Sequence, residues 1–266
     1  MNRKKLLISL AMVMLSMAGL AADNLPALRV QGKNLVDANG KTVVLHGVMD
    51  TPNRYFNGWR WQQWKPDYSE ADIKPCLEYF SKQFSAITDK KQGAYCTVFR
   101  LHMDPCWTND PAKKVENEAD ISAFNMARYR RYLQKLYIPL IKDAIAHGLY
   151  VIVRPPGVCP GDISVGDRYN SYLKGIWKAF AADEYIKQNE GVISIELANE
   201  PVRVHLSDGT DSEKALHDYF QPVVDVIREQ GFKGIIWVPG AGYQSQYQDY
   251  VKYPITDSED NFSYAV

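Results

Sequence analysis

The chain has 266 residues, with 31 Lys and Arg against 31 Asp and Glu, so its formal net charge is zero. Hydrophobic residues make up 46% of it and aromatic residues 12%, a composition typical of one large globular domain. This excludes a disordered tail, a collagen-like fibre and a protein with several membrane spans. The balanced charge also argues against a nucleic-acid partner, because proteins that bind nucleic acids normally carry a basic excess.

Residues 1–21 resemble a secretory signal peptide. Arg3, Lys4 and Lys5 form a basic start, 6–20 is an apolar run without a charge, and small residues lead to Ala21. The apolar run is shorter than the roughly 20 residues of a membrane-spanning helix. We therefore expect cleavage after Ala21, a mature domain of residues 22–266 that is not in the membrane, and a secreted or periplasmic location.

Export permits disulfides, and the four cysteines are Cys76, Cys96, Cys106 and Cys159. They contain no CxxC pair, which argues against a structural zinc site. Cys106 and Cys159 each follow a predicted strand, where the loops of neighbouring strands meet. Among the three full pairings we favour one with a Cys106–Cys159 bridge, and we expect Cys96, which opens a strand, to be a buried thiol.

The predicted elements begin with a small hairpin over 28–36 and a first strand over 42–48. A unit of amphipathic helix, glycine and short apolar strand then recurs four times. Gly93, Gly148, Gly191 and Gly231 suit the left-handed residue that closes a helix. The strands that follow them are expected at 96–101, 149–153, 192–197 and 234–238, and a sixth at 261–266. The helical faces are carried by Ile73, Leu77, Phe80, Phe84 and Ile87; by Tyr129, Leu133, Leu136, Leu140 and Ala144; by Ile176, Trp177 and Phe180; and by Leu216, Phe220, Val223 and Ile227.

The strands are continuous apolar runs, which indicates that helices cover both faces of a parallel sheet or surround a barrel. An open doubly wound sheet usually begins with a glycine-rich phosphate turn, and neither GxGxxG nor GxxxxGK[ST] occurs. We therefore predict an α/β fold of the (β/α)8 TIM-barrel type. A closed barrel needs eight strands, so we expect this one to be incomplete after the sixth strand.

Catalytic groups of such barrels lie at the carboxyl ends of the strands. The predicted strand 192–197 leads directly into Asn199 and Glu200. A glycosidase needs one carboxylic acid beside the leaving oxygen and a second carboxylate across the sugar, and Glu200 suits the first role. Glu196 lies four residues earlier, about 13 Å away at ~3.3 Å per residue, which is too far for the second carboxylate. We expect Glu196 to be a buried charge paired within the barrel.

Three further polar residues lie at strand ends. Arg100 and His102 share one side of the second strand, and Arg154 ends the third. Arg100 can hold an ionised nucleophile or pair with Glu196, and His102 can serve either as a site residue or as a hydrogen-bonded wall residue.

Aromatic residues are concentrated in the predicted loops after the strands. Their flat rings can stack on the apolar faces of pyranose rings. For the tryptophan cluster, the alternative is that it forms a lid that packs on the barrel rim. The candidates are Tyr55, Phe56, Trp59, Trp61 and Trp64 after the first strand, Trp107 after the second, and Tyr243 and Tyr247 after the fifth. Of these, Trp59, Trp61, Trp107 and Tyr243 are the predicted sugar-binding residues, together with His102 and Arg154.

These motifs resemble glycoside hydrolase family five, the cellulase family of retaining barrel glycosidases. The resemblance runs through "LVDANGKTVVLHGV", "VFRLHM", "ISIELANEP" and "NFSYAV". It implies that Glu200 is the acid/base, that Asn199 contacts the substrate 2-hydroxyl, and that Arg100 supports the nucleophile. It implies a polysaccharide or oligosaccharide substrate and no cofactor or metal; the sequence does not set the oligomeric state.

Two features depart from that family. Its third strand usually ends in a histidine, whereas "VIVRPPGVCPG" has Arg154 there and resembles the β-galactosidase relatives of the same clan. Its nucleophilic glutamate comes from the seventh strand, which we expect to be missing from these residues. Glu259 and Asp260 precede the sixth strand and so belong to the opposite end of the barrel.

The sequence thus predicts an exported hydrolase of β-glycosidic bonds that is inactive without the nucleophile. The alternatives are a non-catalytic carbohydrate-binding remnant and a β-galactosidase-like enzyme. A metal-dependent barrel hydrolase is disfavoured, because neither HxH nor HExxH occurs.

Overall fold

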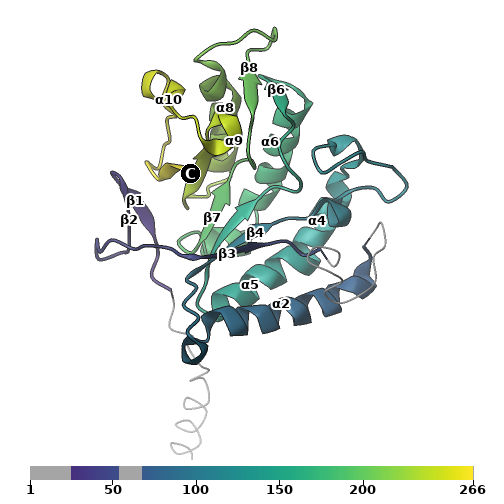
Figure 1. Ribbon diagram of the computed structural model, residues 1–266, viewed down its shortest axis with the longest axis vertical. Helices are drawn as coiled ribbons and strands as arrows, with labels where there is room; N and C mark the ends of the chain where they lie inside the picture. Colours follow the sequence, from purple (N-terminus) through teal and green to yellow (C-terminus); the bar gives the residue numbers. More distant parts are fainter. Residues whose placement is uncertain (1–24, 54–67, 266) are drawn as a thin grey trace, which may run out of the picture.

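The structure is a computed structural model that describes residues 25–53 and 68–265. Its centre is a parallel sheet of six strands in the order β10-β9-β7-β5-β4-β3 (Figure 1). Each step from β3 to β10 joins strands that are consecutive in the barrel and related by a helical crossover, as the predicted unit requires. The strands are β3 (Gly47–Asp50), β4 (Val98–His102), β5 (Tyr150–Arg154), β7 (Ile193–Glu196), β9 (Ile236–Pro239) and β10 (Phe262–Ala265).

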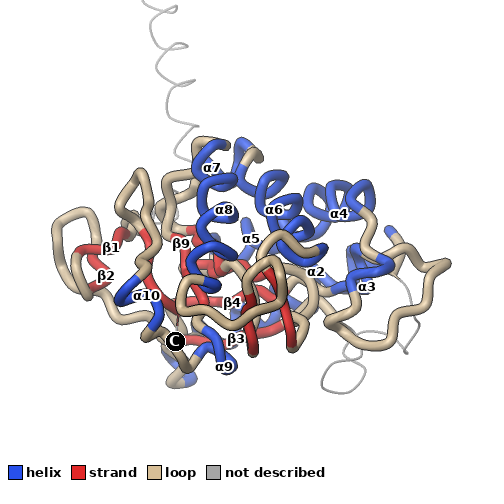
Figure 2. The backbone as a smooth tube through the Cα atoms, turned by 90° about the horizontal axis from the view of Figure 1, so that it is seen from above, coloured by secondary structure: helices blue, strands red, loops and turns tan. Residues whose placement is uncertain are grey.

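The large helices gather on one side of these strands, as Figure 2 shows. They present the predicted apolar faces to the sheet, and Phe80, Phe84, Trp177, Phe220 and Ile227 are all buried. The helices are α2 (Ile73–Thr88), α4 (Met126–Tyr132), α5 (Ile138–Ala146), α6 (Arg168–Ala181), α7 (Glu184–Gln188) and α8 (Ala215–Glu229). Short helical turns are η1 (Glu70–Asp72), η2 (Lys90–Gln92), α3 (Pro105–Thr108), η3 (Ile121–Ala123), α9 (Ala241–Gln244) and α10 (Asp249–Lys252).

The second predicted helix is interrupted. A π-helical turn, η4 (Leu133–Tyr137), separates α4 from α5. Pro139 follows it in the first turn of α5 and has no N–H to donate to the carbonyl four residues earlier. The widened turn lets the helix continue past the proline while its apolar side stays against the sheet.

Three of the four predicted glycine caps have the expected conformation. Gly93, Gly148 and Gly231 have φ of 77°, 79° and 83°, in the left-handed region. Gly191 does not: it lies where a Cβ would come within 2.6 Å of the Cβ of Ala27. The glycine there allows the N-terminal segment to approach, and Asn189 ends α7 instead.

The predicted hairpin closes the amino-terminal end of the sheet. β1 (Arg29–Gln31) and β2 (Asn34–Val36) are antiparallel, and the N–H of Leu28 donates to the carbonyl of Gly191 over 2.9 Å. Leu28 packs with Val98, Tyr150 and Ile235, which lie at the starts of β4, β5 and β9. Residues 42 and 43 bond to the hairpin, so β3 begins at residue 47 rather than at 42 as predicted.

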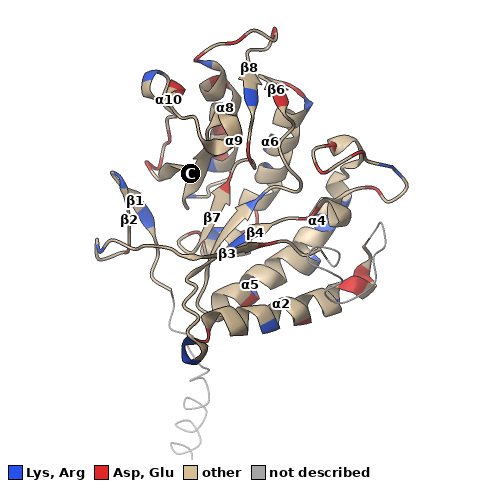
Figure 3. Cartoon of the chain, in the orientation of Figure 1, with Lys and Arg blue, Asp and Glu red and all other residues tan. Residues whose placement is uncertain are grey.

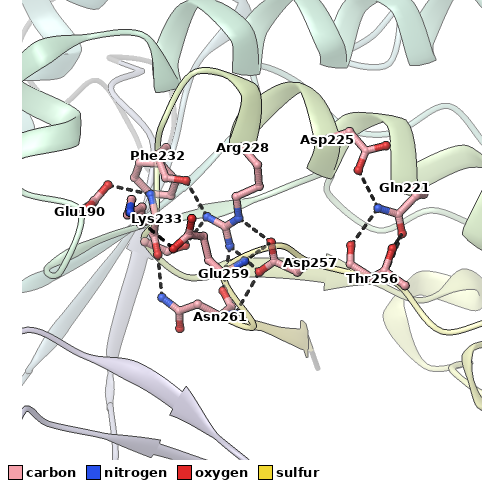
Figure 4. A network of polar contacts seen from close by, with 11 residues as sticks. Glu190, Gln221, Asp225, Arg228, Phe232, Lys233, Thr256, Asp257, Glu259 and Asn261 are labelled. Atoms are coloured by element: carbon pink, nitrogen blue, oxygen red, sulfur yellow. Dashed lines mark hydrogen bonds and ion pairs between the residues drawn. The ribbon is translucent and has the colours of Figure 1, made fainter.

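Arg228 on α8 fixes the segment that leads into β10 (Figure 4). Its guanidinium donates to both carboxylate oxygens of Asp257, over 2.6 and 2.7 Å, and to the carbonyls of Phe232, Gly234 and Asn261. All five N–H groups of the arginine are therefore used. The Asp257 side chain is fully buried, so the pair replaces water at the junction of α8, β9 and β10.

One pair of strands was not predicted. β6 (Asp162–Ser164), in the loop after β5, runs parallel to β8 (Arg203–His205), in the loop after β7. Asp162 forms an ion pair with Arg203 over 2.5 Å. This ribbon ties together the two loops that surround the carboxyl ends of β5 and β7.

The cysteine prediction is wrong. Cys159 is a buried free thiol, so the structure has no Cys106–Cys159 bridge. Burial raises the pKa of the Cys159 thiol, which keeps it protonated and unreactive. Cys96 is half-buried rather than buried. The predicted signal peptide, residues 1–21, lies outside the described residues, and no helix within 25–53 and 68–265 is long and apolar enough to cross a bilayer.

Candidate active site

A polar network crosses the carboxyl end of the sheet from β4 to β7. Arg100 on β4 donates through Nε and Nη2 to the two carboxylate oxygens of Glu196 on β7, over 2.6 and 2.5 Å. Nη2 also lies 3.3 Å from Oδ1 of Asn199. Of the two roles predicted for Arg100, the described residues show the pairing with Glu196. In Figure 3, charged residues of both signs meet along these central strands.

Arg154, the last residue of β5, extends the network. Its Nη1 donates to Oδ1 of Asn199 and its Nη2 to Nδ1 of His102, over 2.5 Å for the latter. Nε2 of His102 lies 3.2 Å from the carbonyl of Gly157. Because β4 and β5 pair His102 directly with Arg154, the backbone register itself brings these two side chains together.

Burial and the charges of the network shift the pKa values of His102 and Arg154. Burial, reinforced by the positive charge of Arg154, holds the pKa of His102 well below its ordinary value, so the imidazole is neutral. Burial together with the neighbouring Arg100 lowers the pKa of Arg154 to about 10, and the guanidinium remains charged at neutral pH. The site therefore combines two arginine cations, one paired carboxylate and a neutral histidine.

Glu200 lies immediately beyond this network and is exposed, whereas Asn199 beside it is buried. Its φ of 54° is in the left-handed region, which costs a non-glycine residue about 1–2 kcal/mol. This conformation turns the chain between the buried Asn199 and Pro201, and Glu200 itself is exposed. Strained backbone of this kind is common at functional sites.

Two hydrogen bonds hold the backbone that leads to Glu200. The indole of Trp177 on α6 donates to the carbonyl of Leu197 over 3.0 Å, and the N–H of Cys159 donates to the carbonyl of Asn199 over 3.0 Å. Both donors come from buried residues. The helix behind β7 and the loop after β5 therefore fix the position of the candidate acid.

Tyr243 is brought close to this segment. Its N–H donates to the carbonyl of Pro201 over 2.9 Å, and the N–H of Gly242 donates to that of Val202 over 3.0 Å. Tyr243 is 67% exposed, and its φ of 58° is again left-handed. An exposed aromatic ring one loop away from the candidate acid is suited to stacking on a sugar.

Trp107 does not have the role that the sequence suggested. It is fully buried, packs against Tyr68 and Tyr132, and donates from its indole to the carbonyl of Pro52 over 2.7 Å. Its ring faces are covered by the core, so it supports the first loop from beneath rather than contacting a sugar. Trp59, Trp61 and Trp64, with Tyr55 and Phe56, lie outside the described residues.

Sequence reasoning missed three polar residues near the site. Gln244 donates to Oε1 of Glu196 over 3.1 Å, the oxygen that also accepts from Nη2 of Arg100. Asp104 and Glu118 are carboxylates whose pKa burial raises, and for Glu118 the charge of Asp104 adds to the effect. Asp104 precedes a proline and caps α3, a helix-start signal that the sequence does contain. No comparable pattern marks Glu118.

Comparison with models of known families matches residues 75–266, most of the chain, to cellulase (glycosyl hydrolase family 5). The chain belongs to glycosyl hydrolase family 5. The resemblance seen in the motifs is therefore confirmed. A comparison with curated proteins gave no match.

Solved structures of family 5 proteins share the fold. A thermostable, halotolerant cellulase from an Icelandic hot spring isolate has a TM-score of 0.58 at 22% identity, covering 92% of this chain and 61% of its own. A β-glucanase from Saccharophagus degradans in complex with cellotetraose has a TM-score of 0.57 at 15% identity, covering 90% and 60%. The catalytic domain of alkaline cellulase K has a TM-score of 0.54 at 20% identity, covering 94% and 58%.

The predicted fold, a (β/α) barrel of which these residues supply six strands, is thus confirmed. This chain spans about three fifths of the length of the family 5 structures that it matches.

Proposed function

We propose that this family 5 protein is an exported hydrolase of β-glycosidic bonds that acts by a retaining mechanism with Glu200 as general acid/base. The observation that carries the proposal is the geometry at the end of β7. There, an exposed carboxylate follows an asparagine whose amide is held by two arginines. The basic and apolar start of the sequence, residues 3–20, supports export to the periplasm or the medium.

In the first step, Glu200 would donate its proton to the glycosidic oxygen as the bond from that oxygen to the anomeric carbon breaks. A nucleophilic carboxylate forms a bond to the anomeric carbon from the opposite face, giving a covalent glycosyl-enzyme. In the second step, ionised Glu200 takes a proton from water. The water oxygen then bonds to the anomeric carbon and releases the nucleophile, so the product keeps its β configuration.

We assign the nucleophile to a glutamate on a further strand of the barrel, as the family resemblance implies. Glu196 is unsuited to this role, because its side chain is only 4% exposed and its oxygens already accept from both Arg100 and Gln244. Arg100 still has capacity for the nucleophile: its Nη1 makes no bond to any residue within the described ranges, and its side chain is 27% exposed. A nucleophilic carboxylate bound at Nη1 of Arg100 would offset the positive charge that remains when Arg100, Arg154 and Glu196 are counted together.

The substrate we propose is a plant-type β-glucan or mannan, or an oligosaccharide from one. The exposed ring of Tyr243, next to the loop that carries Glu200, supports a pyranose ligand. The β-glucanase that shares this fold is solved with cellotetraose, which makes that sugar a suitable first probe.

The test uses the protein expressed from its complete coding sequence. Cellotetraose is incubated with the wild type and with Glu200→Gln, and the products are followed by chromatography and by NMR of the new anomeric centre. We expect β-configured products from the wild type and a loss of at least about a thousandfold in the variant. Sugar binding without turnover by the wild type would instead select a carbohydrate-binding protein, and α-configured products would exclude retention.

A further inference from the structure

The side-chain amide of Asn199 lies between two guanidinium groups. Nη2 of Arg100 and Nη1 of Arg154 both contact its Oδ1. A guanidinium has only hydrogen-bond donors, so the opposite orientation of the amide would set N–H groups against N–H groups. The two arginines therefore determine which end of the amide points into the barrel.

The other end of the amide is left for a ligand. Nδ2 of Asn199 makes no bond to any residue in the described part of the chain, and it is not among the polar atoms there that are both buried and unpartnered. It therefore reaches solvent, although the residue as a whole is buried. Towards a ligand, Asn199 offers two N–H donors and no acceptor.

Arg154 is itself oriented by His102. Because Nη2 of Arg154 can only donate, Nδ1 of His102 must accept, and the proton of the neutral ring lies on Nε2, facing the carbonyl of Gly157. Nε of Arg154 is buried with no partner within the described residues. The Arg154 guanidinium thus donates to Asn199 and His102 while its own Nε stays without a hydrogen-bond acceptor, which is unfavourable for a buried donor.

We propose that Arg154 is a positioning residue that fixes the Asn199 amide with its oxygen inward, so that the site accepts only sugars presenting a hydrogen-bond acceptor to Nδ2. The inference rests on the proposed function in taking a sugar as the ligand. A hydroxyl at that position accepts readily. A protonated amine at the same position is rejected, because it has no acceptor and meets the charges of Arg100 and Arg154.

The first test needs no sugar. In ¹⁵N NMR of the free protein, His102 should show the Nε2-protonated neutral form, and Asn199 a single pair of side-chain amide signals. In Arg154→Lys, which keeps the charge but not the paired donors, the Asn199 signals should shift and broaden. Arg131→Lys is the matched control, since Arg131 pairs with Glu70 on an exposed surface and should leave both sets of signals unchanged. A His102 ring protonated on Nδ1, or Asn199 signals unaffected by Arg154→Lys, would overturn the proposal.

The second test measures binding by calorimetry. We expect the wild type to bind cellotetraose at least about tenfold more tightly than the glucosamine tetramer at pH 6, and Arg154→Lys to lose about tenfold in affinity for cellotetraose. Equal binding of the two sugars by the wild type would overturn the proposal. Failure of the wild type to bind either sugar would count against the proposed function, while the NMR result would still decide the role of Arg154. If Arg154→Lys does not fold, the proposal is still tested by the wild type alone, through the His102 tautomer seen by NMR and the relative affinities for cellotetraose and the glucosamine tetramer.

Discussion

Replacing Arg228 by methionine should destabilise this protein strongly, although Arg228 lies on the helical side of the sheet and not in the site. The substitution keeps the apolar stem but removes the cation that pairs with Asp257, whose side chain is fully buried. It also leaves the carbonyls of Phe232, Gly234 and Asn261 without this donor. Breaking a buried ion pair from one side costs about 3–5 kcal/mol. For a chain of this size that corresponds to a fall in Tm of roughly 6–20 °C.

The assay is thermal unfolding followed by circular dichroism, with Arg131→Met as the matched control. Arg131 and its partner Glu70 are both about half exposed, so the same substitution there should cost less than about 1 kcal/mol. Hydrogen bonds from Arg228 and from the N–H of Asn261 outweigh the effect of burial and hold the pKa of Asp257 below its ordinary value. The stabilisation by this carboxylate is therefore present above about pH 4 and is lost as the pH falls through the lowered pKa. The difference in Tm between the wild type and Arg228→Met should become smaller over the same pH range. A Tm loss no larger than that of the control would refute this reasoning.

Three further predictions concern the site and its support. The pKa of His102 is lower in the folded protein than in the unfolded chain, so below about pH 6.5 the unfolded chain binds a proton that the folded protein does not. The free energy of unfolding should therefore fall by up to ~1.4 kcal/mol per pH unit as the pH is lowered. In urea unfolding at pH 7.5 and 5.0, His102→Gln should lose less free energy of unfolding between the two pH values than the wild type does. Alkylation of the unreduced, denatured protein should modify Cys159, as mass spectrometry would show, and an unmodified Cys159 would contradict the free thiol. Trp177→Phe removes the bond to the Leu197 carbonyl and should cost about 1–3 kcal/mol in chemical unfolding, whereas an unchanged free energy would mean that this bond does not hold β7.

The sequence predicted the sheet because its strands are continuous apolar runs at regular intervals, and that pattern depends on burial alone. It placed the first strand too early, because residues 42–46, with three consecutive apolar side chains, resemble a strand, whereas residues 42 and 43 pair with the hairpin. Trp107 also shows that sequence patterns do not always reveal whether a residue is buried. An aromatic residue in a loop reads as exposed, and only the packing of Tyr68 and Tyr132 around it shows that it is core.

The sequence indicated that four residues of the polar network lie close together, but not how they are hydrogen-bonded. Arg100 and His102 lie on β4, Arg154 ends β5 and Asn199 follows β7, and the parallel register brings these residues to one edge of the sheet. Which nitrogen faces which oxygen depends on side-chain rotamers, which no spacing encodes. The β6–β8 ribbon escaped notice for a related reason, since three-residue strands carry too little periodicity to detect.

The central claim is that Glu200 is the acid/base of a retaining glycosidase, and azide rescue tests it most directly. Glu200→Ala, made in the protein expressed from its complete coding sequence, would be given an aryl β-cellobioside with a dinitrophenyl leaving group, which departs without a proton from the enzyme. We predict that the glycosyl-enzyme forms and accumulates. Azide should then attack its anomeric carbon, release the nucleophile and restore turnover, with β-cellobiosyl azide as the product. Undiminished hydrolysis by Glu200→Ala without azide, or an α-configured azide, would contradict the account.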